Sequence, residues 1–497
     1  MIKPLLFILT LIFSFSCGAA KEIPFQQLSL KTDFKITHPI DSGKLINDKD
    51  QLIAIGENQQ KQRILALFEF TESFNQLQQI QQVVIPANFQ AYDLLTTKQG
   101  QQVIFQTHNA IYAYLPATNK FVKRLDCQSI YLDQHPQFLA KRQLVKDINQ
   151  DGLDEIIIAD FKQINFFWQS ASGKFNLQQL PIRAKVRIRD DAATYSQVNL
   201  FFADMTQDQR PDLVLVENGA LTVYSQQEAQ FNDTPIRFQL PIDVRALEWW
   251  EVTESDGQTM DQHNLQYRTM GQITDLNNDQ IADLIVRYSQ TAGVLDRENS
   301  FEVFLGRIDN GVLLYSATPD SLIKTEGTTI DFKTVDIDQD KRLEVILTSL
   351  DIGISQIIGA LLSGSIDQDV AVFKMDEQGR FNKKPNTNKE VDLKFSLSSG
   401  KSGAPVVVLE DFDGDGLKDL LLSDGEKTLR LYSGTPQDRL FERRSLKYKV
   451  VLPKDGNLVD IKDLNQDGRQ DVVIRYGRQD DQQLTNQFMI LLSKPAS

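Results

Sequence analysis

The chain has 497 residues, of which 41% are hydrophobic and 24% are charged, and this composition excludes a disordered, collagenous or multiply membrane-spanning protein. One hydrophobic core stops growing at about 250 to 300 residues, so the length predicts several domains or a repeat array. Lys and Arg number 53 against 67 Asp and Glu. The formal charge of −14 disfavours nucleic acid and anionic membranes as partners and favours cations.

The first twenty residues have the pattern of an export signal. Lys3 precedes an apolar run from Leu5 to Phe15, and small residues follow up to Ala20. The run is about a dozen residues long, against the roughly 20 that a membrane-spanning helix needs. We therefore predict a signal peptide over 1–20 and one mature domain over 21–497, which is exported to the periplasm or secreted.

Cys17 opens an alternative, because the segment also resembles a bacterial lipoprotein signal. A lipid on this cysteine would hold the protein on the outer membrane and would be its one contact with a bilayer. The chain has two Cys, so Cys127 has no partner for a disulfide within the mature domain. We therefore expect an interaction other than a disulfide to stabilise the exported domain.

Six acidic segments share one frame of nine positions, and we call them the acidic loops. Those that begin at Asp147, Asp411 and Asp463 read D-x-[DN]-x-D-G-x-x-[DE]. Those that begin at Asp204, Asp275 and Asp336 have Gln or Lys in place of Gly at position 6. Position 2 and the three residues after position 9 are apolar in all six. Such short apolar runs predict a strand, buried on both faces, after each loop.

This spacing suits a hard cation. Ca²⁺ takes six to eight oxygens, and side chains at positions 1, 3 and 5 converge when the backbone between them curls. Gly at position 6 makes the turn at low cost, position 7 can offer its carbonyl, and position 9 adds a carboxylate. The predicted ligands are Asp147, Asn149, Asp151, Leu153, Glu155, Asp204, Asp208, Asp212, Asp275, Asn277, Asp279, Asp283, Asp336, Asp338, Asp340, Glu344, Asp411, Asp413, Asp415, Leu417, Asp419, Asp463, Asn465, Asp467, Arg469 and Asp471.

The three loops with Gly predict three calcium sites, and the other three raise the number to six if they also bind. The alternative is that Asp, Asn and Gly form Asx turns between strands without a metal. Three or four clustered carboxylates repel one another, which favours the metal.

These loops resemble the VCBS and FG-GAP repeats of integrin α-chain heads and exported bacterial proteins. The resemblance implies an all-β fold, a β-propeller in which each repeat is one four-stranded blade and the acidic loop holds calcium. Asn47–Asp50 and Tyr92–Leu94 look like two eroded copies, which makes eight blades, or seven if the first unit only caps the ring. We expect Phe25–Leu30 to pair beside Phe488–Leu492 and close the ring.

Two insertions interrupt the repeats. The first, 243–271, contains Trp249 and Trp250, which either contact a sugar or protein ligand or plug the ring. In the second, apolar residues between Ile354 and Leu362 have helical spacing and predict one short helix on the propeller. A membrane-surface helix is the alternative, but the segment lacks the basic face that such helices use.

Nothing in the sequence compels an enzyme. The four His do not form an H-E-x-x-H motif, no G-x-S-x-G motif occurs, and most paired acids belong to the acidic loops. The sequence predicts a monomeric, exported, calcium-binding propeller that acts as a non-catalytic binding or scaffold module for a polysaccharide, cell-envelope or protein ligand. A propeller lyase or glycosidase and a lipid-anchored envelope assembly factor are the alternatives.

Overall fold

Each apolar run that follows an acidic loop forms the second strand of an antiparallel sheet, as predicted. The computed structural model describes residues 25–71, 73–131, 138–189, 192–252, 260–261, 263–291, 297–324, 328–350, 364–396 and 401–495. The expected signal peptide, Cys17 and the expected helix over 354–362 lie outside these residues. In the described part, no helix is long and apolar enough to cross a membrane.

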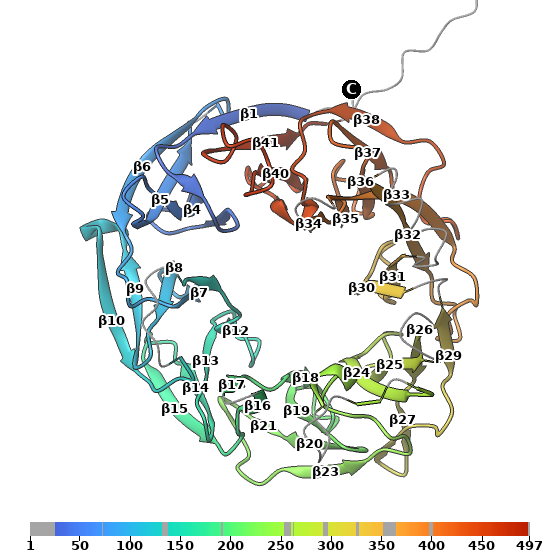
Figure 1. Cartoon of the computed structure of the whole chain (residues 1–497). Coiled ribbons are helices and arrows are strands. Elements are labelled where there is room, and N and C mark those ends of the chain that lie inside the picture. The colour runs from blue at the N-terminus through green and yellow to red at the C-terminus, as the bar shows by residue number, and fades with distance from the viewer. Residues whose placement is uncertain are drawn as a thin grey trace, which may run out of the picture.

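Eight sheets stand around a central axis as the blades of a propeller (Figure 1). We number the blades 1 to 8 and name the strands of each from the inner edge outwards. Blade 1 has β2 (Lys35–Ile36) and β3 (Asp41–Gly43), both paired with β4 (Gln51–Glu57), then β5 (Arg63–Phe70) and β6 (Leu77–Val84). Blade 2 has β7 (Ala91–Thr97), β8 (Gly100–Gln106), β9 (Ala110–Leu115) and β10 (Lys120–Asp126), and the short β11 (Ala140–Lys141) pairs parallel with β7 at its inner edge. Blade 3 has β12 (Val145–Lys146), β13 (Glu155–Ala159), β14 (Ile164–Gln169) and β15 (Phe175–Leu180).

The other five blades follow the same order. Blade 4 has β18 (Phe201–Ala203), β19 (Asp212–Glu217), β20 (Ala220–Tyr224) and β23 (Ile236–Gln239). Blade 5 has β24 (Gln266–Thr274), β25 (Asp283–Thr291), β26 (Arg297–Phe304) and β29 (Ser321–Lys324). Blade 6 has β30 (Thr328–Val335), β31 (Glu344–Leu350), β32 (Ser365–Phe373), β33 (Thr387–Ser396) and β34 (Lys401–Gly403). Blade 7 has β35 (Val407–Glu410), β36 (Asp419–Ser423), β37 (Thr428–Tyr432) and β38 (Leu446–Lys449), and blade 8 has β39 (Val459–Lys462), β40 (Asp471–Arg475), β41 (Gln487–Ser493) and β1 (Phe25–Lys31).

Short hairpins and 3₁₀ turns lie in the connections between the blade strands. The two-stranded hairpins are β16 (Lys185–Arg189) with β17 (Ala192–Ser196), β21 (Gln226–Gln227) with β22 (Gln230–Phe231), and β27 (Arg307–Asp309) with β28 (Val312–Leu314). The 3₁₀ turns are η1 (Pro116–Thr118), η2 (Trp249–Glu251) and η3 (Gly456–Leu458). The predicted all-β fold is confirmed, and of the two blade counts that the sequence allowed, eight is correct.

The ring closes where we expected. β1 pairs antiparallel with β41, with Phe25 opposite Ser493 and Leu30 opposite Phe488. Leu28 and Leu30 pack against the core between blades 8 and 1, which includes Phe488 and Ile490. The first described strand therefore completes the last blade and leaves no open edge on β41.

The core lies between neighbouring sheets and not at one centre. One cluster joins Leu52 and Phe68 of blade 1 to Val473 of blade 8, and another joins Ile346 of blade 6 to Leu420 of blade 7. Since the second strand of a blade faces a neighbour on both sides, its side chains are buried in both directions. That explains why apolar residues follow one another without alternation there.

Strand direction separates the connections into two sets. The first-to-second and third-to-fourth connections of each blade lie at one end of the ring, which we call the acidic-loop face because all six acidic loops lie there. The second-to-third connections and the links between blades lie at the other end, which we call the opposite face. The 243–271 insertion and the β16–β17 hairpin link successive blades, so both belong to the opposite face.

We predict that a variant lacking residues 25–31 loses about 5 kcal/mol of the free energy of unfolding, because Phe25, Leu28 and Leu30 lose their apolar burial. Urea unfolding against the full chain measures this loss. A variant that ends at Ser493 is the control, since Lys494 and Pro495 are exposed. Equal unfolding midpoints for the two truncated variants would contradict closure by β1.

Candidate metal centres

The six acidic loops share one backbone conformation. Position 4 and position 6 have positive φ in every loop, and position 6 is in the left-handed region whether or not it is Gly. The φ values at position 6 are 84° for Gly152, 67° for Gln209, 67° for Gln280, 67° for Lys341, 91° for Gly416 and 85° for Gly468. A side chain at such a position costs about 1 kcal/mol, and the surrounding hydrogen bonds have to offset that cost.

Those hydrogen bonds repeat from loop to loop. The position 1 carboxylate accepts from the N–H of position 6, with distances from 2.7 Å at Asp204 to 3.1 Å at Asp336. The position 5 carboxylate accepts from the N–H of position 7, at 2.9 Å from Asp151 to Leu153 and 2.8 Å from Asp415 to Leu417. The loops without Gly thus have the same frame as the loops with it.

The position 9 carboxylate joins the end of each loop to its beginning through a hydrogen bond. It is fully buried in all six, as Glu155, Asp212, Asp283, Glu344, Asp419 and Asp471. Each accepts the N–H of position 2 at 2.9 to 3.0 Å. In the four Asp cases the second oxygen accepts an N–H from a residue at the end of the third strand of the blade or just after it, and the N–H of Gly434 lies 2.7 Å from Asp419 Oδ1. The buried acid therefore ties the loop to its own sheet.

Burial raises the pKa of these acids. The pKa reaches about 7 at Glu155, Asp283, Asp419 and Asp471, and about 8 at Glu344, while that of Asp212 is also raised. Hydrogen bonds from the backbone oppose the shift, and the neighbouring loop acids add to it. Without a nearby cation, Glu155, Asp283, Asp419 and Asp471 therefore lose their protons only near pH 7, and Glu344 only near pH 8.

The donors in the loops fit a calcium ion. Carboxylate oxygens of Asp411, Asp413 and Asp419 lie within 4.8 Å of one another, and those of Asp336, Asp338 and Glu344 do the same. The loops at 147, 275 and 463 have an Asn amide at position 3 instead of a third clustered acid, and Thr206 stands there in the loop at 204. Among the described residues, the structure thus brings three predicted acids together in the loops of blades 6 and 7, and the acids of the other four loops do not form such a group of three. The carbonyls of Leu153, Leu417 and Arg469 remain predicted ligands, and the guanidinium of Arg469 pairs with Asp467 in its own loop.

Backbone hydrogen bonds also join the loops of neighbouring blades. The position 8 N–H of Leu343 donates to Leu276 O, that of Lys418 to Ile337 O, and that of Gln470 to Asp411 O, each at 2.8 Å. The loops of blades 5 to 8 are consecutive links in this chain. A loop that is held in one conformation therefore also restrains the loop of the next blade.

The eroded copy at Asn47–Asp50 lies where the sequence analysis expected it, and this loop has no acid at the buried position that follows it. Asn47–Asp50 connect β3 to β4, where the acidic loop of other blades lies. Gln51 occupies the buried position and accepts the N–H groups of Leu45 and Ile46 at 2.9 and 3.0 Å. A neutral amide thus does in blade 1 what a carboxylate does elsewhere, and the sequence pattern did not reveal it.

The second eroded copy was misplaced. Tyr92–Leu94 lie within β7, and the corresponding turn of blade 2 is at Thr97–Gly100. Asp93 accepts the N–H groups of Leu144 and Val145 at 2.8 and 3.2 Å, so it ties blade 2 to blade 3. A single Asp before an apolar run could not reveal this role, because its partners are about 50 residues away.

The two tryptophans have different surroundings. Trp249 is buried against Leu265 and Tyr267, as a plug would be. Trp250 is 38% exposed, with Arg287 over its ring at 5.5 Å. Only Trp250 is placed to meet a ligand from outside.

A cationic cavity that the sequence did not predict extends from the opposite face along the inner strands of blades 3 and 4. It has a volume of about 1000 Å³ and is lined by Tyr131, Lys141, Arg142, Lys146 and Tyr195 among others. None of its described lining residues is Asp or Glu, although the chain as a whole has a charge of −14. Lys141 is paired with Asp41, so Arg142 and Lys146 provide most of the charge.

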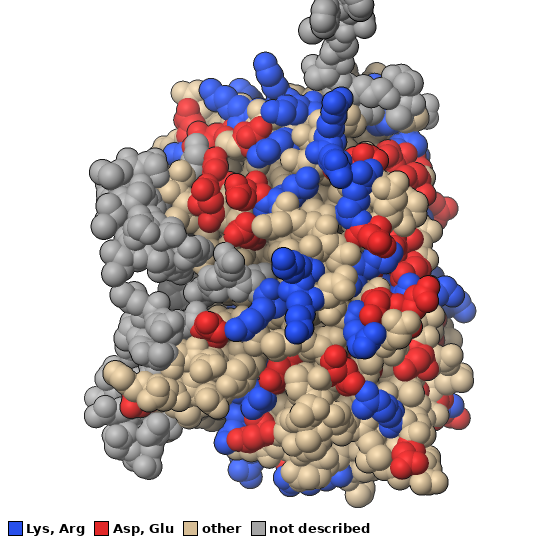
Figure 2. Space-filling model, turned by 90° about the vertical axis from the view of Figure 1, so that its right-hand side faces the viewer, with Lys and Arg blue, Asp and Glu red and all other residues tan. Residues whose placement is uncertain are grey.

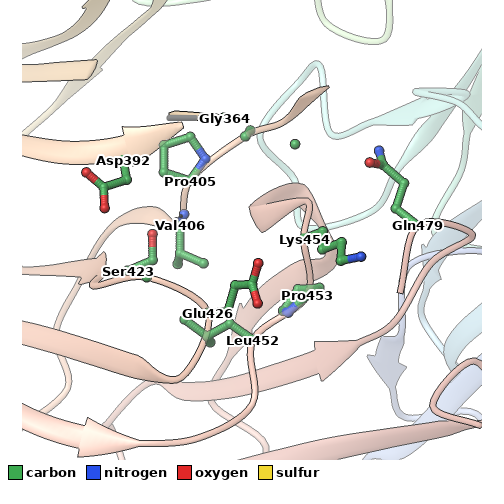
Figure 3. A pocket seen from close by; sticks show the side chains of 13 residues that line it. Gly364, Asp392, Pro405, Val406, Ser423, Glu426, Leu452, Pro453, Lys454 and Gln479 are labelled. Atoms are coloured by element: carbon green, nitrogen blue, oxygen red, sulfur yellow. Dashed lines mark hydrogen bonds between the residues drawn. The ribbon is translucent and has the colours of Figure 1, made fainter. Parts of the chain in front are cut away.

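A second, smaller cavity of about 220 Å³ lies on the same face near blades 7 and 8. Figure 3 shows Ser423, Glu426 and Lys454 around it, with Asp392 and Gln479 at its edges. It has charges of both signs. By contrast, the outer wall over blades 5 to 7 has acidic and basic side chains interspersed (Figure 2), and several are paired there, such as Arg430 and Lys447 with Asp424.

Comparison with known proteins agrees with this geometry. Residues 147–215 match the family model of the FG-GAP-like repeat, a span that contains the acidic loops of blades 3 and 4. The chain is therefore an eight-bladed β-propeller in which residues 147–215 are similar to an FG-GAP-like repeat. No curated protein sequence matches it significantly.

Solved structures with a similar course include an Agrocybe aegerita lectin that recognises non-reducing terminal N-acetylglucosamine. That lectin is 13% identical, over 85% of this chain and 94% of its own, with a TM-score of 0.41. The Vibrio cholerae biofilm matrix protein Bap1 is 11% identical, over 95% and 92%, with a TM-score of 0.31. The WD40 domain of SCAP from fission yeast is 11% identical, over 94% and 98%, with a TM-score of 0.38.

We predict that in EGTA the free energy of unfolding falls as the pH rises from 5 to 8. The folded protein holds protons on the position 9 acids up to about pH 7, whereas the unfolded chain releases them near pH 4. Denaturant unfolding at several pH values measures this slope. Saturating calcium should remove the fall, and a midpoint that rises with pH in EGTA would contradict the prediction.

Proposed function

We propose that the protein is an exported, calcium-braced propeller that works as a non-catalytic binding or scaffold module. The observation that carries the proposal is the chain of loop-to-loop hydrogen bonds on the acidic-loop face. An ion that fixes one loop also fixes its contact with the next blade. The described part of the ring contains no disulfide, and the bound ions would hold it at the blade junctions instead.

The energies are of the right size for a structural role. At about 1 mM calcium and a Kd of about 0.1 mM, each site adds roughly 1.4 kcal/mol, so three sites add about 4 kcal/mol to a whole-protein stability of about 5 to 15 kcal/mol. Six ions would also bring the formal charge from −14 to about −2. Calcium would therefore relieve both local and overall repulsion.

The choice of variant for a test follows from position 5, which is Asp in all six loops. We predict that Asp415→Asn weakens one calcium site by about tenfold or more and reduces the rise in melting temperature that calcium causes. The amide keeps the acceptor for Leu417 N–H but removes the charge. Calorimetric titration and thermal unfolding with calcium or EGTA measure both effects.

The control is Asp309→Asn, which changes the same charge on the exposed β27–β28 hairpin. Wild-type protein that binds no calcium and melts at the same temperature in EGTA would reject the brace. Equal effects of the two substitutions would reject the role of the loop.

In this proposal the ligand binds on the opposite face, which has the cationic cavity and Trp250. Arg142 and Lys146 together with Tyr131 and Tyr195 offer charge and ring faces, and these suit an acidic polysaccharide of the cell envelope. Export through the signal at 1–20, or a lipid on Cys17, would place the protein beside such polymers. Separating the two faces lets the brace stay fixed while the other end meets its ligand.

We predict that replacing Arg142 and Lys146 together by Ala lowers affinity for an acidic polysaccharide at least tenfold, while calcium binding by the loops other than the one at 147, which directly follows Lys146, is unchanged. Affinity electrophoresis in gels containing alginate, with neutral dextran for comparison, gives the measurement. Replacing Arg443 and Arg444 by Ala removes the same charge from the third-to-fourth connection of blade 7 on the acidic-loop face. Equal retardation of wild type and both double variants would place the binding surface elsewhere.

A further inference from the structure

The acidic loop of blade 6, at 336–344, has a charged neighbour that comes from outside the loop. Lys374, directly after β32, donates a hydrogen bond to Asp338 at position 3. The Lys374 side chain is 16% exposed and that of Asp338 is 5% exposed, so the pair is largely shielded from water. Within the same loop, Arg342 holds the position 5 acid, Asp340, with Nε 3.1 Å from Oδ2.

The register of the strands explains how Lys374 reaches the loop. Val345 pairs with Phe373, so the next residue, Lys374, stands opposite the position 9 acid Glu344. The residues at the same register in blades 3, 4, 5, 7 and 8 are Trp168, Ser225, Leu305, Ser433 and Leu492. All five are uncharged. Among the six acidic loops, only this one therefore receives a cation from that strand position.

The oxygens around Lys374 form a site that needs positive charge. Asp336, Asp338 and Glu344 offer oxygens within 4.8 Å of one another, as the corresponding acids of blade 7 do. Glu344 is fully buried and its Oε1 has no hydrogen-bond partner in the described part of the chain, and the same holds for Oδ1 of Asp336 and of Asp338. Buried acceptors of this kind are costly unless a cation lies beside them.

We propose that Lys374 is a built-in cation that takes the place of the metal in the blade 6 loop. This inference rests on the proposed function, because it divides the six loops into calcium sites and one site that needs no calcium. The ammonium group has one positive charge and three protons to donate, and it is covalently attached to the sheet that the loop must contact. Blade 6 then keeps its link to the loops of blades 5 and 7 when calcium is low.

Two exchanges between blades test this proposal. Lys374→Leu gives blade 6 the residue that blades 5 and 8 have at the same register, and Ser433→Lys gives blade 7 the lysine of blade 6. We expect Lys374→Leu to bind one more calcium ion per chain than wild type, and Ser433→Lys to bind one fewer. Calorimetric titration counts the sites, and calcium analysis after dialysis checks the count. Lys383→Leu, an exposed lysine in the same connection, is the control and should leave the count unchanged.

The outcomes separate the two proposals. A wild type that binds calcium and a Lys374→Leu variant with the same count would overturn the built-in cation. A wild type that binds none, beside a Lys374→Leu variant that binds one, would support the built-in cation and reject calcium bracing. If Lys374→Leu fails to fold, Ser433→Lys decides, because an unchanged count in that folded variant also overturns the inference.

Discussion

The acidic-loop face depends on one contact, the hydrogen bond from the N–H of position 2 to a fully buried carboxylate at position 9. This contact fixes where the loop ends and where the second strand begins. It also buries an acid among apolar side chains, which is costly unless opposite charge lies nearby. A cation in the loop resolves this conflict, and the other features of the loop, from the converging acids to the left-handed backbone, serve to receive it.

The repeat pattern was enough to predict most of the architecture. Because Ile148, Met205, Leu276, Ile337, Phe412 and Leu464 are apolar at position 2 and apolar triplets follow position 9, the sequence indicated both the loop and the buried strand after it. The pairing of Phe25–Leu30 with the last strand followed from the general need of a ring to close. The spacing of residues close in sequence is thus enough to locate the loops and the buried strands.

Contacts between distant residues could not be predicted in the same way. Lys374 lies 36 residues after Asp338, and only the register of β31 with β32 brings them together. Gln51 replaces an acid in blade 1, but a glutamine before an apolar run has no visible signature. Gly at position 6 does not mark a separate backbone conformation, since Gln209, Gln280 and Lys341 have positive φ at that position as the glycines do.

The pairing of β1 with β41 also sets the order in which the molecule can be completed. The two strands lie far apart in the sequence, so β1 is synthesised long before its partner β41. Until β41 is available, β1 is an unpaired strand with Phe25, Leu28 and Leu30 uncovered, and an unpaired strand edge favours association with other chains. A growing chain can therefore stack its first seven blades in succession, but the ring closes only after β41 has been synthesised.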